Sequence, residues 1–317
     1  MRYRARVARV LLSAGLLASV ATRLDAGCVY PPLVYGVYSV GTKAGPGKVP
    51  LATRLGELQE SGVTMITGVE DAAVLDALPA GMQAVPGCAL MHERDWKRDG
   101  RWDEAAARVQ LERIAARWAN HPKVYGVCLT HEVEEYADHA RRHWMYELAK
   151  PFFPKKKVIQ YYGVLWDRLN PARETVRGYG ERGELETDVL FVSLQAATRE
   201  GRFDANRAEK LREILEQAQR TPGIPVWVQT SINADHKYVD GPRSMYEVWG
   251  KHGENMRRWA DSVLRTEVRG TDARPVRLAG FFWRSLGRFP YDLGYPEFAE
   301  HRAALRAIGR DICHPAR

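Results

Sequence analysis

The sequence is poor in cysteine and has no apolar run long enough to cross a membrane. It contains four cysteines in 317 residues, and none of them is in the CxxC spacing typical of a structural zinc site. The longest uncharged apolar run, at positions 10–21, falls short of the about 18 residues that a membrane-spanning helix needs. No Gln, Ser or Gly tract indicates disorder. A 45% hydrophobic and 27% charged composition is that of a globular domain.

Several well-known catalytic and cofactor-binding motifs are also missing. The Gly-rich stretch at positions 41–47 has neither the GxGxxG pattern nor the GK[ST] ending of nucleotide-binding loops. The GxSxG turn of serine hydrolases is absent, and position 135 is Glu where HExxH would have its second His. We therefore expect no organic cofactor and no bound metal.

The positive net charge is weak evidence for a polyanionic partner. The chain carries a formal charge of +8, of which residues 1–26 supply +4 through five Arg and one Asp. The remaining +4 is small for a domain of this size, and we find no basic helix or recognition motif. Nucleic-acid binding is not expected.

The first 26 residues have the pattern of a secretory signal peptide. A basic start containing Arg2, Arg4 and Arg6 precedes the short apolar run. Cleavage is expected after position 21 or 26. Processing as a lipoprotein before Cys28 is a second interpretation, although the residue three positions earlier is Asp25, where such signals usually have Leu. We expect an exported protein that is periplasmic, extracellular or lipid-anchored at the cell surface, with no transmembrane span in the mature protein.

An oxidising compartment would allow the cysteines to pair. A Cys28–Cys313 disulfide would join the two ends of the mature domain. Cys88 and Cys128 lie in neighbouring predicted strands, where they could pair or be buried as thiols, and burial is the favoured interpretation.

Residues 29–317 are predicted to form one α/β domain, a (β/α)8 TIM barrel. Short, almost continuously apolar runs alternate with helical patterns, as expected for parallel strands covered by helices. An open doubly wound sheet is the alternative. The predicted strands are Leu33–Val40, Gly62–Val69, Met82–Leu90, Val124–Thr130, Val158–Leu165, Asp188–Ala196, Ile224–Thr230 and Leu278–Ser285. The predicted helices are 103–119, 139–149, 204–220, 244–264 and 296–312.

Polar and aromatic residues gather where these strands end, which is the face on which barrels carry their active sites. Aromatic rings can stack on the C–H faces of sugars, while amides, His and Arg can bind hydroxyl groups. This composition predicts a carbohydrate-binding cleft. The candidate substrate-binding residues are Tyr38, Glu70, His92, Glu93, His131, Tyr161, Gln195, Gln229, Asp235, Trp283 and Arg284.

The segment Asn120–Glu132 resembles the fourth-strand segment of glycoside hydrolases of the (β/α)8-barrel superfamily. In those enzymes a His-Pro turn precedes a strand that contains Gly and ends in an acidic residue. The resemblance implies that Glu132 is the general acid/base. The run Gly280–Arg284 is similar to the closing strand of these barrels, so the resemblance implies that Trp283 forms the floor of a sugar site.

The sequence departs from the family pattern at two positions. His131 precedes the acid where the family has Asn or Asp, and the seventh strand ends in Gln229 where retaining enzymes have a nucleophilic Glu. An amide cannot act as a carboxylate nucleophile. The second carboxylate would have to be another residue: Asp167 is the first choice, and Asp235, Glu70 and Glu93 are the others.

Three functional hypotheses follow from these residues. The first is a secreted glycoside hydrolase-like enzyme that acts on a poly- or oligosaccharide, with Glu132 and Asp167 as catalytic residues. The second is a non-catalytic barrel that binds extracellular glycan. The third is a metal-dependent hydrolase, which requires His131 or His92 to converge with carboxylates.

Overall fold

The computed structural model describes most of the barrel domain. Its described residues are 29–38, 50–87, 90–92, 95–98, 101–130, 139–162, 183–194, 207–218, 224–231, 253–270, 273–284 and 299–312. The predictions for the signal peptide, for lipidation of Cys28 and for a Cys28–Cys313 disulfide lie outside these residues.

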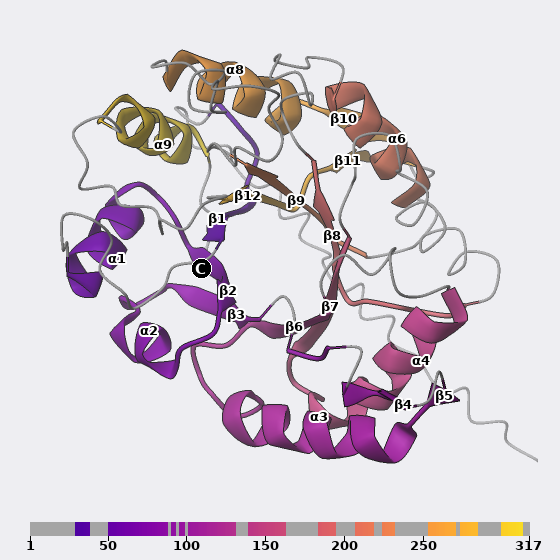
Figure 1. Ribbon diagram of the computed structural model, residues 1–317. Helices are drawn as coiled ribbons and strands as arrows, with labels where there is room; N and C mark the ends of the chain where they lie inside the picture. The colour runs from indigo at the N-terminus through magenta and orange to yellow at the C-terminus, as the bar shows by residue number, and fades with distance from the viewer. Residues whose placement is uncertain are drawn as a thin grey trace, which may run out of the picture.

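Eight parallel strands form the central sheet in the order β3-β2-β1-β12-β9-β8-β7-β6. The edge strands β3 and β6 also meet, since the amide of Ala84 donates to the carbonyl of Lys123 at 2.8 Å and the amide of Tyr125 donates to that of Ala84 at 2.9 Å. These contacts close the sheet into the ring seen in Figure 1, and they confirm the predicted barrel. The strands are β1 (Val34–Tyr38), β2 (Met65–Val69), β3 (Gln83–Pro86), β6 (Gly126–Thr130), β7 (Lys157–Tyr162), β8 (Leu190–Ser193), β9 (Val226–Ser231) and β12 (Gly280–Arg284).

Helices surround the ring of strands (Figure 1). Asp71 and Asp103 begin α2 and α3, where their carboxylates accept hydrogen bonds from the amides of Ala73 and Ala106. The five predicted helices are present, and α1 and α2 are additional to them. The helices are α1 (Leu51–Glu60), α2 (Ala72–Ala77), α3 (Glu104–Trp118), α4 (His139–Ala149), α6 (Arg207–Ala218), α8 (Gly253–Leu264) and α9 (Ala299–Asp311), with a 3-10 turn at Lys150–Phe152.

Two short antiparallel hairpins complete the described structure. One consists of β4 (Lys97–Arg98) and β5 (Arg101–Trp102), and the other of β10 (Glu267–Arg269) and β11 (Pro275–Arg277). Neither was expected from the sequence, because strands of two or three residues are too short to show a period. Among the described helices, none is long and apolar enough to cross a membrane.

Strand alternation creates two separate apolar cores. Most buried side chains lie between the barrel wall and the helices. A smaller set fills the inside of the barrel, so this barrel has a packed interior. Gly36 makes room there, since a Cβ at this position would lie 2.2 Å from the ring of Phe282. The interior set is Met65, Val85, Cys128, Ile159, Tyr161, Val189, Phe191, Trp227 and Phe282.

Cys128 is fully buried in this interior core, in agreement with the expected burial. Its thiol lies 3.6 Å from the carbonyl oxygen of Thr130. Position 88 lies outside the described residues, so pairing of these two cysteines is not addressed by the structure.

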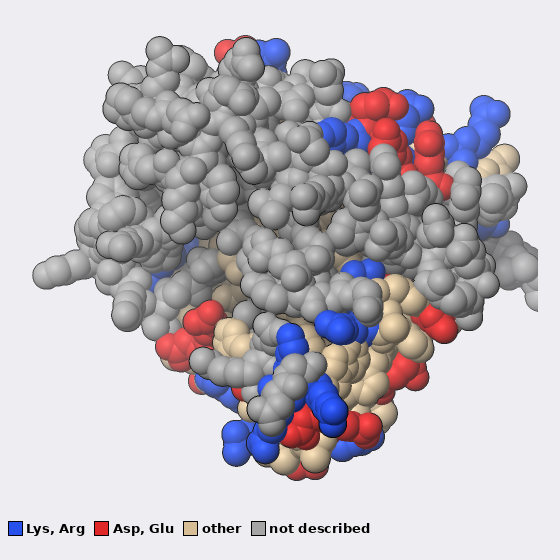
Figure 2. Space-filling model, turned by 45° about the vertical axis from the view of Figure 1, so that its right-hand side comes forward, with Lys and Arg blue, Asp and Glu red and all other residues tan. Residues whose placement is uncertain are grey.

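Basic and acidic residues are mixed on the described part of the surface. Figure 2 shows Lys and Arg interspersed with Asp and Glu on the visible face, with no broad region of one sign among the described residues. Many of these charges pair locally, as Arg108 does with Glu104 one helical turn away.

Candidate functional site

The carboxyl ends of the barrel strands bring several predicted site residues together. Strand register places Tyr38 level with Thr67 on one side and with Arg284 on the other. Arg284 is in turn level with Ser231 of β9. Tyr38 packs against the interior core, and Thr67, two residues after the interior Met65, lies on the same face. The carboxyl mouth is therefore more polar than the aromatic interior beneath it.

Tyr38 is partly buried at the mouth and lies against Gly68. A Cβ at Gly68 would lie 2.8 Å from the ring of Tyr38, and Gly68 has a φ of +71°. Only glycine adopts this backbone conformation at little cost. The glycine therefore lets the tyrosine ring lie close to the end of β2.

Tyr161 and Gln229 form a buried pair inside the barrel. The side-chain amide of Gln229 donates to the hydroxyl of Tyr161 at 3.0 Å, and both side chains are fully buried. Beneath them Phe191, Trp227 and Phe282 form an aromatic cluster with ring centroids 5.0 to 5.7 Å apart. The sequence predicted both members of the pair as substrate-binding residues, and the structure brings them into contact.

On the interior face of this end, two buried oxygens have no hydrogen-bond partner among the described residues. They are Oε1 of Gln229 and Oγ1 of Thr67. A buried polar atom without a partner costs roughly 1–3 kcal/mol, and such atoms are uncommon in stable interiors. Both residues are fully buried.

The remaining predicted site residues are less informative. Glu70 is exposed just after β2, and its backbone carbonyl accepts a hydrogen bond from Arg117 at 3.3 Å. His92 is exposed in a turn, where its amide donates to Asp95 at 2.8 Å. The backbone of Arg284 ends β12, but its side chain is not described. Glu93, His131, Glu132, Asp167, Gln195 and Asp235 lie outside the described residues.

Trp283 differs from its expected position. It is fully buried between the barrel wall and the helices, where its indole nitrogen donates to the hydroxyl of Tyr35 at 2.9 Å. The Tyr35 hydroxyl in turn donates to the carbonyl of Leu305 in α9 at 3.2 Å. Phe282, one residue earlier, is the side chain that points into the barrel. The alternation of β12 therefore places Trp283 on the wrong side of the wall to form the floor of a sugar site.

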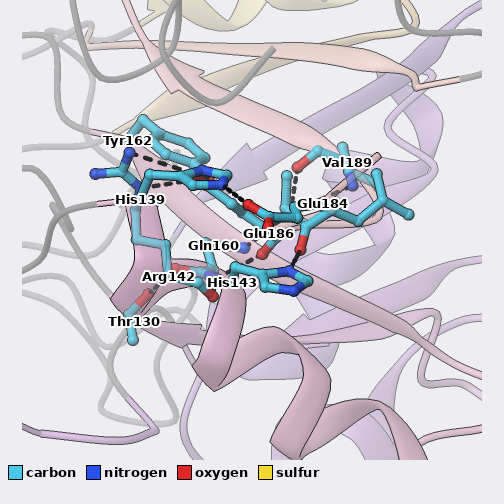
Figure 3. Close-up of polar contacts among 11 residues, drawn as sticks. Thr130, His139, Arg142, His143, Gln160, Tyr162, Glu184, Glu186 and Val189 are labelled. Atoms are coloured by element: carbon cyan, nitrogen blue, oxygen red, sulfur yellow. Dashed lines mark hydrogen bonds and ion pairs between the residues drawn. The ribbon is translucent and has the colours of Figure 1, made fainter. Parts of the chain in front are cut away.

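The histidines of α4 contact carboxylate and carbonyl oxygens (Figure 3). The rings of His139 and His143 are stacked 6.2 Å apart. His139 contacts Glu184 and Glu186, whereas Nδ1 of His143 lies 2.6 Å from the carbonyl oxygen of Leu185. Within the described residues, no three His, Cys, Asp or Glu side chains are placed to hold a metal ion.

Sequence reasoning missed Thr67 and Ser193, which lie on the interior face near the carboxyl mouth. Ser193 is level with Gln229 in the register of β8 and β9. Counting by twos from the buried Met65 and Phe191 would have identified both positions, since every second residue of a barrel strand faces the interior.

A hollow lies where β1, β2 and β3 begin. Its volume is about 470 Å³. Among the described residues that line it, none is charged, and Tyr125 on its wall has its pKa raised by burial and, to a smaller extent, by the charge of Asp188. The lining residues include Val34, Met65 and Gln83, which begin β1, β2 and β3.

Comparison with known proteins places the chain in a structural class. No family model matches the sequence, and no curated protein matches it significantly. The fold matches solved (β/α)8 structures over most of this chain. A beta-glucuronidase from Faecalibacterium prausnitzii aligns with a TM-score of 0.57 and 14% identity, over 92% of this chain and 50% of that one.

Two further solved structures are similar. A GH2 beta-galacturonidase from Eisenbergiella tayi, bound to galacturonate, aligns with a TM-score of 0.55 and 12% identity, over 88% of this chain and 51% of that one. A glucosidase from Croceicoccus marinus aligns with a TM-score of 0.53 and 11% identity, over 90% and 67% of the two chains. This chain thus spans about half the length of the first two proteins. At these identities the likeness establishes the fold.

Proposed function

We propose that this protein is an exported glycoside hydrolase-like enzyme that acts on a poly- or oligosaccharide by carboxylate acid–base catalysis. The observation that carries the proposal is the carboxyl mouth, where Thr67 and Gln229 hold buried oxygens without described partners above an aromatic interior. The hydroxyl groups of sugars can donate hydrogen bonds to such oxygens. The glycosidase activities of the three similar structures support the same substrate class.

Glu132 is the proposed general acid. It follows the end of β6 at Thr130 by two residues, which is where barrel enzymes carry catalytic side chains. Its role would be to protonate the oxygen of the leaving sugar. Asp167, which follows the end of β7, is the proposed base or nucleophile, with Asp235, Glu70 and Glu93 as the other candidates.

The second candidate function is glycan binding without cleavage. Gln229 favours it, because the fully buried side chain on the seventh barrel strand is an amide that binds Tyr161. A hydrolase can still operate if its second carboxylate comes from another strand. The two functions therefore differ in whether turnover occurs.

The test is a turnover and binding assay on the full chain. The substrates are 4-nitrophenyl β-glucoside, β-glucuronide and β-galacturonide, followed by a panel of polysaccharides read by the release of reducing ends. The variants are Glu132→Gln and, as a control, Glu147→Gln, an exposed carboxylate on α4. On the polysaccharides, whose leaving sugar oxygen has to be protonated, loss of general acid catalysis is expected to lower kcat by about 10²- to 10⁴-fold in Glu132→Gln alone.

Each outcome distinguishes the candidate functions. Polysaccharide turnover that survives Glu132→Gln unchanged removes Glu132 from the chemistry. Glycan binding by calorimetry without turnover in the wild type supports the binding protein. Where turnover is present, the anomer of the first product separates a retaining from an inverting mechanism, which require carboxylates about 5–5.5 Å and about 6.5–9.5 Å apart.

Export is part of the same proposal and has its own test. The basic and apolar pattern of residues 1–26 supports it. Expression of the full chain in a bacterial host, followed by N-terminal sequencing of the protein from the periplasm, should give a start at position 22 or 27. A lipid-modified N-terminus at Cys28 would support the lipoprotein interpretation, and an intact Met1 in the cytoplasm would contradict both.

A further inference from the structure

The hollow where β1, β2 and β3 begin has the size of a ligand-binding pocket. Its volume of about 470 Å³ lies within the range of about 300–1,000 Å³ that is usual for small-molecule sites. None of the predicted catalytic or substrate-binding residues is among the described residues that line it. The hollow is therefore a candidate for a second site, separate from the one at the carboxyl ends of the strands.

The rim of the hollow consists of the turn after α1 and the turn before β3. The amide of Gly62 donates to the carbonyl of Gln59 at 2.9 Å where α1 ends. The side-chain amide of Gln59 donates to the carbonyl of Ala80 at 2.9 Å and so joins the two turns. Gly62 and Gly81, one in each turn, line the hollow without adding a side chain that would fill it. The rim is therefore built by contacts within the protein, as in a preformed ligand site.

The lining is apolar and buried inside the hollow, and polar and exposed at its rim. The side chains of Val63, Met65 and Met82 are buried, whereas Gln59 and Gln83 are exposed. Methionine is flexible and polarizable, so it can adapt its shape to an apolar group that lies against it. Small-molecule sites have this character, with a mainly apolar lining and a few polar groups that orient the ligand.

Tyr125 supplies a hydroxyl group on the wall of the hollow. Its ring packs against that of Trp227 with the centroids 5.5 Å apart, so the side chain is held in place from the barrel interior. Burial raises the pKa of Tyr125, and the charge of Asp188 raises it further, so the hydroxyl stays protonated at neutral pH. Because no described lining residue is charged, an ion that entered would lose hydration without gaining a partner of opposite charge.

We propose that this hollow binds a small uncharged molecule with an apolar ring and a hydroxyl group. The ring lies against Val63, Met65 and Met82, and the hydroxyl forms a hydrogen bond with that of Tyr125. A rigid ring suits a preformed site, since it loses little conformational freedom on binding. This binding goes beyond the proposed function and does not depend on it, because no residue proposed for glycoside hydrolysis takes part.

The test is NMR of the full chain with ¹³C-labelled methionine methyl groups. The chain has seven methionines, and the variants Met65→Leu and Met82→Leu assign the two signals of the hollow. The probes are 2-phenylethanol and phenylacetate, which share a skeleton but differ in charge. We expect 2-phenylethanol to shift both signals with a Kd of about 5 mM or tighter, while the signal of Met256 in α8 stays unchanged. Phenylacetate should bind at least about tenfold more weakly.

Two variants test the contacts, and both change residues that are not fully buried. Tyr125→Phe removes only the hydroxyl and should weaken the binding of 2-phenylethanol by about 3- to 10-fold. Gln83→Trp adds a large side chain to the lining and should weaken it by at least about tenfold. Glu112→Trp is the matched control, since position 112 is exposed on α3 and does not line the hollow. It should leave the Kd unchanged.

Saturable shifts of the Met65 and Met82 signals that are lost in Gln83→Trp support the site. Shifts that do not saturate up to about 20 mM 2-phenylethanol, equal affinity for the two probes, or unchanged affinity in Gln83→Trp would each overturn it. Shifts confined to other methionines would also overturn it, because the probe would then bind elsewhere. A protein that binds 2-phenylethanol here but cleaves no glycoside keeps this site and loses the proposed function. An active glycosidase without these shifts loses the site alone.

Discussion

The side-chain amide of Gln229 donates a hydrogen bond to the hydroxyl of Tyr161 at 3.0 Å across the inside of the barrel. The two residues come from β9 and β7, with β8 between them. The amide hydrogen is thereby used within the protein, while the amide oxygen has no described partner. Tyr161 therefore orients the side chain of Gln229, and this arrangement gives the first prediction.

Gln229→Leu should separate stability from glycan binding. The change removes one hydrogen bond, but it also removes a buried acceptor that has no described partner. These effects oppose each other, so the free energy of unfolding is expected to stay within about 1 kcal/mol of wild type. Binding of a glycan that the wild type recognises should be lost. Urea denaturation and calorimetry measure the two quantities.

Tyr161→Phe is the control for this prediction. It leaves the amide of Gln229 buried without its acceptor, so it should destabilise the fold by about 1–3 kcal/mol. A larger loss of stability in Gln229→Leu than in Tyr161→Phe would contradict the assignment of Gln229 to the ligand.

Trp283→Phe should lower stability without affecting binding. Trp283 is fully buried on the helix side of the wall and donates to Tyr35. Loss of that bond and of part of the ring is expected to cost about 1–3 kcal/mol. Affinity for any glycan ligand should equal that of the wild type at a temperature where both are folded. A selective loss of affinity with unchanged stability would restore the role of Trp283 in sugar binding.

The sequence was sufficient to predict the barrel and its strands, but less so to predict which side chains face its interior. Eight apolar runs separated by helical patterns leave few alternative folds. Their continuity, however, hides the alternation, because both faces of each strand are buried. In β12, Phe281, Phe282 and Trp283 are equally apolar and all buried, so nothing local indicates that Phe282 is the interior one.

The polar group around Glu186, shown in Figure 3, was beyond sequence reasoning for a different reason. Its members Thr130, His139, Gln160 and Glu186 are joined by hydrogen bonds but lie up to 56 positions apart in the chain. Each reads alone as an ordinary polar residue at the edge of a helix or strand. Their contacts depend on how α4 packs on β7, and the residue pattern of neither element predicts that packing.

Gly68→Ala should displace the ring of Tyr38 at the carboxyl ends of the barrel strands. The φ of +71° at Gly68 disfavours any residue with a Cβ, and that Cβ would lie 2.8 Å from the tyrosine ring. We expect a loss of at least about 1 kcal/mol in the free energy of unfolding, with weaker glycan binding as Tyr38 moves.

Gly56→Ala in α1 is the matched control. No atom lies within 4 Å of its Cβ position, and Ala should stabilise that helix by about 0.5–1 kcal/mol. If Gly68→Ala and Gly56→Ala changed the free energy of unfolding equally, this explanation would be contradicted.

Tyr30 links the start of the domain to α8 and predicts how stability changes in alkali. Burial, together with the charge and hydrogen bond of Asp261, raises the pKa of Tyr30 to about 12. The hydroxyl donates to Asp261 at 3.3 Å, and the side chain is 4% exposed. An unfolded chain would release this proton near its ordinary value of 10.0. Between these two values the folded state binds more protons than the unfolded state.

The stability that Tyr30 contributes is therefore fully present below about pH 10 and is lost as the pH rises towards about 12. Tyr30→Phe lacks this proton, so its free energy of unfolding should fall less steeply over that interval. The difference in slope cannot exceed about 1.4 kcal/mol per pH unit for a single proton. Urea denaturation of both proteins at closely spaced pH values measures it, and other tyrosines cancel because both proteins contain them. If the free energies of unfolding of the two proteins changed equally with pH from neutral upwards, Tyr30 would ionise equally in the folded and unfolded states.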